Sequence, residues 1–126
     1  MEEIIIIGAG VAGLSAALEL AKNGVKSVVA ADMPSERAQS VMAEGGINAA
    51  FPSDMDSPDL HTEETLRAGR YLADPAAVCD LAENAPNIIE ELLADGMSFT
   101  LNSEGRPDVR AFGGQSVRRT YYAASN

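Results

Sequence analysis

Three glycines, at positions 8, 10 and 13, follow the apolar run 4–7 and open a segment with helical periodicity. Glycine at the first position permits a tight turn from strand to helix, and glycine at the second lets the backbone approach a pyrophosphate closely. Glycine at the third lets the helix pack against the strand. The spacing Gly8-x-Gly10-x-x-Gly13 therefore predicts dinucleotide binding. The alternative is a glycine turn that only closes the corner between strand and helix.

The segment around these glycines predicts a βαβ unit. The run 3–7 is largely β-branched and lacks alternation, which is typical of a strand buried on both faces of a parallel sheet. A helix is expected over 11–23 with Gly24 at its C-terminal cap, and a second strand over 27–31. A right-handed crossover would make the two strands parallel. We therefore expect an α/β fold that begins like a Rossmann domain.

An acidic residue after the second strand is expected to bond the ribose of the nucleotide. Asp32 is the candidate, although it lies slightly beyond the usual spacing of about 20 residues. The alternative places Ala31 at the ribose and leaves Asp32 as a solvated charge.

The next segment, 37–48, helps to distinguish FAD from NAD. Arg37 and Ser40 could reach phosphate oxygens, and Gly45-Gly46 would let the backbone approach a flat ring. These features favour FAD. The composition of the segment fits a flexible surface loop equally well.

Loops and helices are expected further along the chain. The stretch 51–59 carries prolines, serines and aspartates and predicts an exposed loop. A short helix is expected to begin with Thr62 as its cap. The stretch 97–101 is a candidate strand.

A second helix is expected between these two regions. Asp74-Pro75 predicts its start, with an aspartate cap and proline at the first helical position. Pro86 is expected to interrupt this helix or to start a new one, and Gly96 is expected to stop it.

Charge and cysteine content narrow the classes of function. The 126 residues carry a formal net charge of −10, which argues against binding to nucleic acid and, more weakly, to an anionic membrane surface. The single cysteine, Cys79, lies in an apolar helical stretch and is expected to be buried. No cysteine spacing typical of a metal site is present, and the apolar run 4–7 is too short to span a membrane. With an acidic start unlike a signal peptide, the chain is expected to be cytoplasmic, without a metal or a transmembrane segment.

Five separated motifs occur in order along the chain, namely 40–50 (SVMAEGGINAA), 56–61 (DSPDLH), 71–74 (YLAD), 85–92 (APNIIEEL) and 112–120 (FGGQSVRRT). In these motifs the chain resembles the flavoprotein subunits of fumarate reductase and succinate dehydrogenase. Those proteins share a superfamily with the L-aspartate oxidases. The resemblance covers essentially the whole chain.

The resemblance implies where FAD would lie. Phe99 and the segment Phe112-Gly113-Gly114 would line the dicarboxylate side of the flavin. In membrane-bound members a histidine attaches FAD covalently, whereas Gln39 stands at that position here and has no nucleophilic ring nitrogen, so the resemblance implies non-covalent FAD. The implied cofactor contacts are Gly8, Ala9, Gly10, Gly13, Ser40, Ala43, Glu44, Gly45 and Gly46, with Arg37 and Gln39 beside the cofactor.

The resemblance also implies an activity, namely hydride transfer between flavin and a C4 dicarboxylate. Phe112 stands where aspartate oxidases tend to carry an acidic residue, which favours fumarate or succinate as the substrate. The alternatives are an L-aspartate oxidase-like flavoenzyme and a non-catalytic FAD-binding fragment. An iron–sulfur or other electron-transfer subunit is the implied partner, and it could hold the protein at the periphery of the cytoplasmic membrane.

The chain is expected to be the N-terminal portion of an FAD-binding domain within an FAD-dependent oxidoreductase, and to be inactive by itself. Residues 1–50 would form the βαβ unit and flavin loop, and residues 51–126 the following loop, helices and Phe-Gly-Gly segment. The resemblance implies that the family's capping and C-terminal helical domains lie outside this segment. No catalytic residue is expected in this segment, because the family's catalytic residues come later.

Four arginines lie near the end of the chain, and the sequence predicts different roles for them. Arg106, Arg110 and Arg118 are expected to be surface charges or partners in local ion pairs. Arg119 is not expected to be only a surface charge, because with Thr120 it matches a motif that lies near the active site in the family it resembles.

Overall fold

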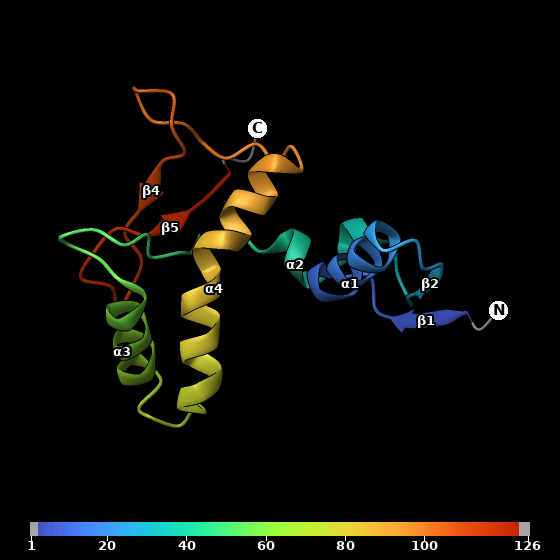
Figure 1. The fold of residues 1–126 in the computed structure, drawn as a ribbon, viewed down its shortest axis with the longest axis horizontal. Helices are drawn as coiled ribbons and strands as arrows, with labels where there is room; N and C mark the ends of the chain where they lie inside the picture. The colour runs from blue at the N-terminus through green and yellow to red at the C-terminus, as the bar shows by residue number, and fades with distance from the viewer. Residues whose placement is uncertain (1–2, 124–126) are drawn as a thin grey trace. The chain divides into compact units, whose positions relative to one another are not determined.

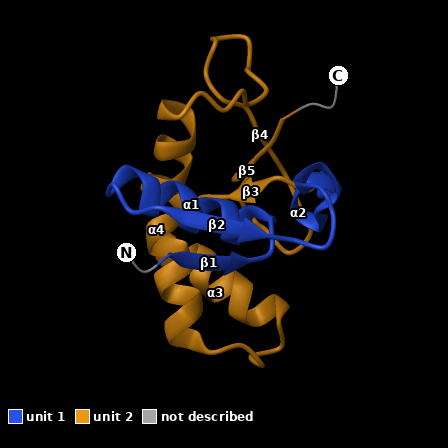
Figure 2. Ribbon diagram, turned by 90° about the vertical axis from the view of Figure 1, so that its right-hand side faces the viewer, with its two compact units in different colours: residues 1–44 blue, residues 45–126 orange. Residues whose placement is uncertain are grey.

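The computed structural model describes residues 3–123, which fold as two compact units (Figure 1). The first unit comprises residues 1–44 and the second residues 45–126, coloured blue and orange in Figure 2. Each unit has a sheet of its own.

The first unit begins with the predicted βαβ arrangement. Strands β1 and β2 pair in parallel, in a register that runs from Ile4 opposite Ser27 to Ile7 opposite Ala30. Helix α1 connects them and is followed by Gly24 with φ +72°, which confirms the predicted end of the helix. The elements of this unit are β1 (Ile4–Ile7), α1 (Val11–Lys22), β2 (Ser27–Ala30), a 3₁₀ turn η1 (Ser35–Arg37) and α2 (Gln39–Met42).

The turn between β1 and α1 requires glycine at two positions. Gly8 has φ +108°, a conformation that costs other residues energy, and its N–H donates to the carbonyl of Ala30 at 2.8 Å. A Cβ atom at Gly13 would collide with the carbonyl oxygen of Gly8 and approach Cγ2 of Ile6 within 3.3 Å. The third glycine is therefore what allows α1 to lie against β1.

The prediction that the first strand is buried on both faces is wrong for these residues. Ile5 is 67% exposed and Ile7 is 90% exposed, and α1 has no buried residue. The physical reason is that a sheet of two strands with one helix cannot cover both of its faces.

The second unit combines two helices with a small antiparallel sheet. Its strand order is β3-β5-β4, so the last strand lies between the other two. Helices α3 and α4 lie side by side (Figure 1). The elements are β3 (Ile47–Asn48), α3 (Pro58–Ala68), α4 (Pro75–Ala94), β4 (Val109–Arg110) and β5 (Thr120–Tyr121).

The core of the second unit lies between α4 and the sheet. Ala85 and Ile89 of α4 pack with Ala49 and Phe99. The ring of Tyr121 meets the rings of Phe51 and Phe99 edge to face, with centroids 5.8 and 6.0 Å away. This packing connects α4 to β5 and to the residues that follow β3.

Helix α3 begins five residues before the expected position, at Pro58 with Ser57 as the cap. The Ser57 hydroxyl accepts the N–H of Leu60 at 3.1 Å. Thr62 lies in the second turn of the helix, so the prediction that it is the cap is wrong. Serine followed by proline is a stronger start signal, because it combines a cap with a fixed φ at the first helical position.

Helix α4 begins as predicted and continues further than expected. The Asp74 carboxylate accepts the N–H of Ala76 at 3.0 Å, and the helix ends at Ala94, just before Gly96 with φ +92°. It is not interrupted at Pro86, which lies inside it. Proline removes one backbone hydrogen bond, but the buried residues Ala82, Ala85 and Ile89 lie on both sides of it and hold one continuous helix against the core.

The predicted strand over 97–101 does not form. Only Leu101 makes an isolated bridge, to Pro107, while Thr100 donates its N–H to the carbonyl of Tyr122 at 2.8 Å. The segment is held mainly by Phe99, which is 6% exposed and part of the core.

Cys79 is half-buried on α4, so the prediction that it is buried is only partly correct. Its thiol donates to the Glu83 carboxylate at 3.4 Å. That bond raises the pKa of the thiol above its usual value. Among residues 3–123, no helix combines the length and apolar character needed to cross a membrane.

Candidate cofactor-binding site

A pocket of about 410 Å³ lies where the glycine turn meets the end of β2. It brings together residues from three separate parts of the first unit. Gly8, Ala9 and Gly10 come from the glycine turn, Asp32 from the end of β2, and Gln39 and Ser40 from the start of α2. The structure therefore assembles six of the residues predicted from sequence around one cavity.

The N-terminus of α1 opens onto this pocket, and glycine at its cap position leaves the space in front of the helix free. Gly10 is the cap residue and makes no side-chain hydrogen bond to the helix. The Ser40 hydroxyl accepts the N–H of Val11 at 2.9 Å, and a Cβ atom at Gly10 would lie 3.2 Å from that hydroxyl. The backbone N–H groups in the first turn of a helix carry partial positive charge and suit phosphate oxygens. The local structure therefore fits the pyrophosphate of a dinucleotide.

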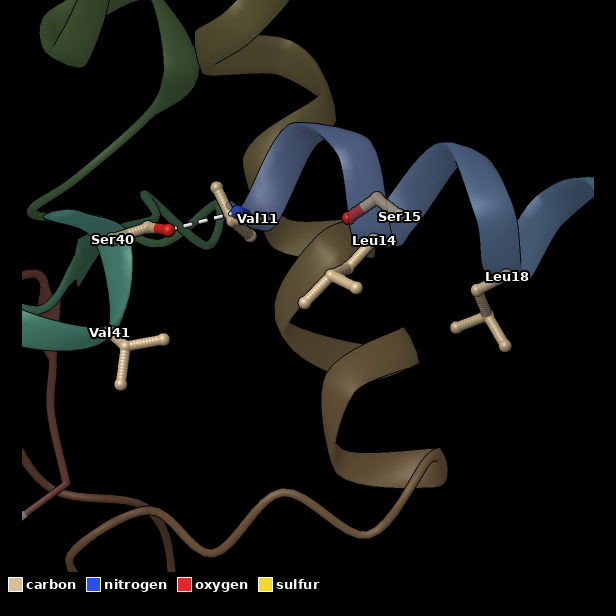
Figure 3. Close-up of a pocket in the computed structure, with 6 residues that line it drawn as sticks. All are labelled: Val11, Leu14, Ser15, Leu18, Ser40 and Val41. Atoms are coloured by element: carbon tan, nitrogen blue, oxygen red, sulfur yellow. Dashed lines mark hydrogen bonds between the residues drawn. The ribbon is translucent and has the colours of Figure 1, made fainter. Parts of the chain in front are cut away.

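A second pocket, of about 280 Å³, lies on the neighbouring face of α1 (Figure 3). In Figure 3 the Leu14, Leu18 and Val41 side chains extend from α1 and α2 toward the same side, while Ser40 reaches the start of α1. Ser40 borders both pockets. The apolar lining of the second pocket does not suit phosphate, so the glycine turn remains the candidate for the anionic part of a ligand.

Three other predicted contacts lie outside the pocket at the glycine turn. Arg37 is exposed in η1 and is not among the residues that line it. Ala43 caps the C-terminus of α2, and Glu44 is exposed at the end of the first unit.

In the second unit, Gly46 is fixed by the strand beside it. Its φ is +97°, and a Cβ atom there would collide with the carbonyl oxygen of Tyr121 and lie 2.9 Å from Cγ2 of Thr120. The carbonyl of the neighbouring Gly45 accepts a hydrogen bond from the Arg110 guanidinium at 2.8 Å. Both predicted loop glycines are therefore held against the small sheet.

The predicted substrate-side residues occupy different environments. Phe112 is 54% exposed, and a Cβ atom at Gly45 would lie 3.9 Å from its ring. A Cβ atom at Gly113 would have nothing within 4 Å, whereas Gly114 has φ +86°. Phe99 lies in the core instead. Phe112 and Gly113 therefore offer an open surface beside Gly45, and Phe99, which is 6% exposed, is not part of that surface.

The environment of Arg110 differs from the expectation of a surface charge. Besides bonding Gly45, its guanidinium lies 4.7 Å from the ring centroid of Tyr122 and 6.0 Å from that of Phe112. Arg106 does form the expected local ion pair, with Glu104 at 2.9 Å.

A buried charged cluster involves Arg119, which is 1% exposed. Its guanidinium donates to both carboxylate oxygens of Asp56, at 3.0 and 2.7 Å, and to Glu64 at 2.7 Å. Glu64 also accepts the backbone N–H of Ser116 at 2.9 Å. Sequence reasoning placed Asp56 and Arg119 in separate motifs but did not pair them. Their opposite charges were the only feature of the sequence that could have indicated the pairing.

Burial and charge together set two pKa values in this cluster. Burial alone would raise the pKa of Glu64, but hydrogen bonds from Ser116 and Arg119 outweigh it and hold that pKa below its usual value. Burial, reinforced by the charge of Arg119, lowers the pKa of His61. At neutral pH Glu64 is therefore ionised and His61 is neutral.

Comparison with known proteins relates this chain to FAD-binding proteins. The FAD binding domain family matches residues 3–126. The succinate dehydrogenase flavoprotein subunit of Bacillus subtilis is 39% identical over 124 residues, 97% of this chain and 21% of that protein. L-aspartate oxidase 2-a, chloroplastic, of Nicotiana tabacum is 38% identical over 122 residues, 97% of this chain and 19% of that protein. The chain thus spans about a fifth of the length of these relatives.

A solved structure agrees with the sequence comparison. A chain of the Mycobacterium smegmatis Sdh1 complex in the apo form matches with a TM-score of 0.87 and 32% identity, over 98% of this chain and 22% of that chain. This agreement confirms the predicted α/β fold class as a partial FAD-binding domain.

Proposed function

The chain belongs to the FAD binding domain family, and we propose that it forms the FAD-binding N-terminal region of an oxidoreductase acting on a C4 dicarboxylate. The observation that carries the proposal is the pocket at the glycine turn. It combines a helix start that has glycine at its cap position with a carboxylate just after the second strand. Those are the two features that a dinucleotide needs, one for its pyrophosphate and one for its ribose.

The proposed roles of the residues follow from where they lie. Gly8, Ala9 and Gly10 would leave room for the pyrophosphate, and Gly13 would keep α1 close enough to bind it. Asp32 would bond the ribose. Gln39 and Ser40 would border the cofactor from α2. Arg37, Ala43, Glu44, Gly45 and Gly46 are proposed as further contacts from the resemblance alone.

FAD would supply the hydride acceptor and donor, and the protein would hold and orient it. We propose that attachment is non-covalent, because the Gln39 side chain carries an amide where a ring nitrogen would be needed. The test is acid precipitation of the purified full-length protein. Yellow supernatant and a colourless pellet are expected, whereas flavin retained in the pellet would contradict non-covalent binding.

The proposed substrate is fumarate or succinate, on the side of the flavin lined by Phe112, Gly113 and Gly114. Phe112 presents an apolar ring and no carboxylate to pair with a substrate amine. The full-length protein is expected to reduce fumarate with a reduced viologen dye. Oxidation of L-aspartate by oxygen, without fumarate reduction, would instead favour an aspartate oxidase, and tight FAD binding without turnover would favour a non-catalytic FAD-binding protein.

We further propose that an electron-transfer subunit, such as an iron–sulfur protein, associates with the full-length protein. The basis is that the structural relative is described as a complex. Copurification from native extracts tests this proposal. Fractionation tests the proposed location, in the cytoplasm or at the periphery of its membrane: flavoprotein in the soluble fraction, or released by salt, is expected.

A further inference from the structure

We propose that Gln115 is a positioning residue that holds the turn Phe112–Gly114 in place beside the loop glycine Gly45. The inference rests on the proposed function, because the place of this turn matters to catalysis only if a dicarboxylate binds there. It adds a specific residue, with a specific hydrogen-bond path, to that function.

Gln115 closes the turn from within. Its side-chain Oε1 accepts the backbone N–H of Phe112 at 3.3 Å, and its own backbone N–H donates to the Phe112 carbonyl at 3.3 Å. The Gln115 side chain therefore holds the backbone of Phe112, whose ring is exposed. Loss of the side chain would leave the turn with only its backbone bond.

The other end of the same amide connects the turn to the sheet. Nε2 of Gln115 donates to the hydroxyl of Thr120 at 3.0 Å. Thr120 is 2% exposed, and its hydroxyl donates in turn to Oδ1 of Asn48 at 2.6 Å. A hydroxyl has one hydrogen to donate, and Oδ1 of Asn48 is a closer acceptor for it than Oε1 of Gln115, which lies at 3.3 Å, so the bonds run from the turn to Asn48. Asn48 lies in β3, two residues after Gly46, and pairs with Thr120 in the sheet.

Both ends of the turn are also held by other groups. Ser116, on its C-terminal side, donates its N–H to the buried Glu64. Arg110, on its N-terminal side, donates to the carbonyl of Gly45. The outer face is open, since Phe112 is 54% exposed and a Cβ atom at Gly113 would meet nothing within 4 Å. The turn thus has a fixed inner face and a free outer face, which is what a surface that presents a substrate requires.

The test compares two substitutions of Gln115 in the natural full-length polypeptide. Gln115→Leu removes every side-chain hydrogen bond of this residue, whereas Gln115→Glu keeps an acceptor for the Phe112 N–H. Asn102→Leu is the matched control, because the Asn102 side chain accepts the N–H groups of Glu104 and Arg106 in a different turn of the same unit. Three quantities are measured: bound FAD per protein, hydrogen exchange of the Phe112 amide, and kcat/KM for fumarate.

Gln115→Leu is expected to accelerate exchange of the Phe112 amide by roughly fivefold to tenfold and to lower kcat/KM by a similar factor, with FAD content unchanged. Gln115→Glu is expected to keep the amide protected, and Asn102→Leu to change neither quantity. Unchanged exchange in Gln115→Leu, or faster exchange with unchanged kcat/KM, would overturn the positioning role while leaving the proposed function intact. A wild-type protein that binds FAD but turns over no dicarboxylate would overturn the proposed function, and the positioning role with it.

Discussion

Arg119 and Glu64 lie 55 residues apart in the sequence, and their side chains meet at 2.7 Å inside the second unit. They are 1% and 3% exposed. Asp56 binds the same guanidinium through both of its oxygens, so one arginine joins the loop before α3, α3 itself and the start of β5. Glu64 of this cluster also accepts the N–H of Ser116, which lies on the C-terminal side of the turn Phe112–Gly114.

Removal of one partner from this cluster is expected to be strongly destabilising. Glu64→Leu leaves the buried guanidinium of Arg119 with only Asp56 for charge compensation, and the free energy of unfolding should fall by about 3–5 kcal/mol. Denaturant titration measures the change. Glu104→Ala removes an exposed partner of Arg106 and should cost less than about 0.5 kcal/mol. Equal costs for the two substitutions would contradict a structural role for the buried cluster.

Acidification is expected to weaken the second unit in two stages. The pKa of His61 is lowered from 6.5, so the unfolded state takes up the proton first and stability falls as the pH drops below 6.5. The pKa of Glu64 is lowered from 4.5, so its contribution is present above 4.5 and is lost as the pH falls through the lower folded value.

The His61 stage can be isolated with His61→Gln. Urea unfolding at pH 7.5 and pH 5.5 should show a smaller loss of stability for this variant than for the wild type. The groups that act on His61 are Arg119, Asp56 and Glu64, and the substitution leaves all three in place. Identical losses in both proteins would show that His61 does not titrate in this range.

Gly10→Val is expected to abolish FAD binding without unfolding the first unit. The new side chain would start 3.2 Å from the Ser40 hydroxyl and occupy the space proposed for the pyrophosphate. Flavin absorbance per protein should fall at least tenfold. Ala16→Val places the same side chain at an exposed position of α1 outside that pocket and should retain the cofactor. Retained flavin in Gly10→Val would place the cofactor elsewhere.

Alanine substitutions at Gly46 and Gly105, which both have positive φ, distinguish the cost of backbone strain from the cost of steric collision. Gly105 has φ +77° and open space around it, so Gly105→Ala should cost about 1–2 kcal/mol for the backbone alone. Gly46→Ala adds a collision with the Tyr121 carbonyl and should cost about 1–3 kcal/mol more. Thermal unfolding of both variants measures the difference, and equal midpoints would mean that β5 moves aside without cost.

Local signals in the sequence determined the elements that depend on near neighbours. The glycine spacing after the run 4–7, the Asp74-Pro75 start and the Gly96 stop each predict a local conformation, and the structure has all three. The prediction of a helix start at Thr62 was wrong because Ser57-Pro58 is a stronger start signal. The prediction of a break at Pro86 was wrong because packing on both sides of the proline outweighs one lost hydrogen bond.

Tertiary structure decided which distant residues meet. The sequence by itself determined the turn at Gly8, the helix that follows it and the resemblance to one family, since these depend on residue type and spacing along the chain. It did not determine that Arg119 would be buried between Asp56 and Glu64, or that Gln115 would reach Asn48 through Thr120. The Arg119–Glu64 and Thr120–Asn48 contacts join residues 55 and 72 positions apart, and only the packing of α3, α4 and the small sheet brings them within hydrogen-bond distance.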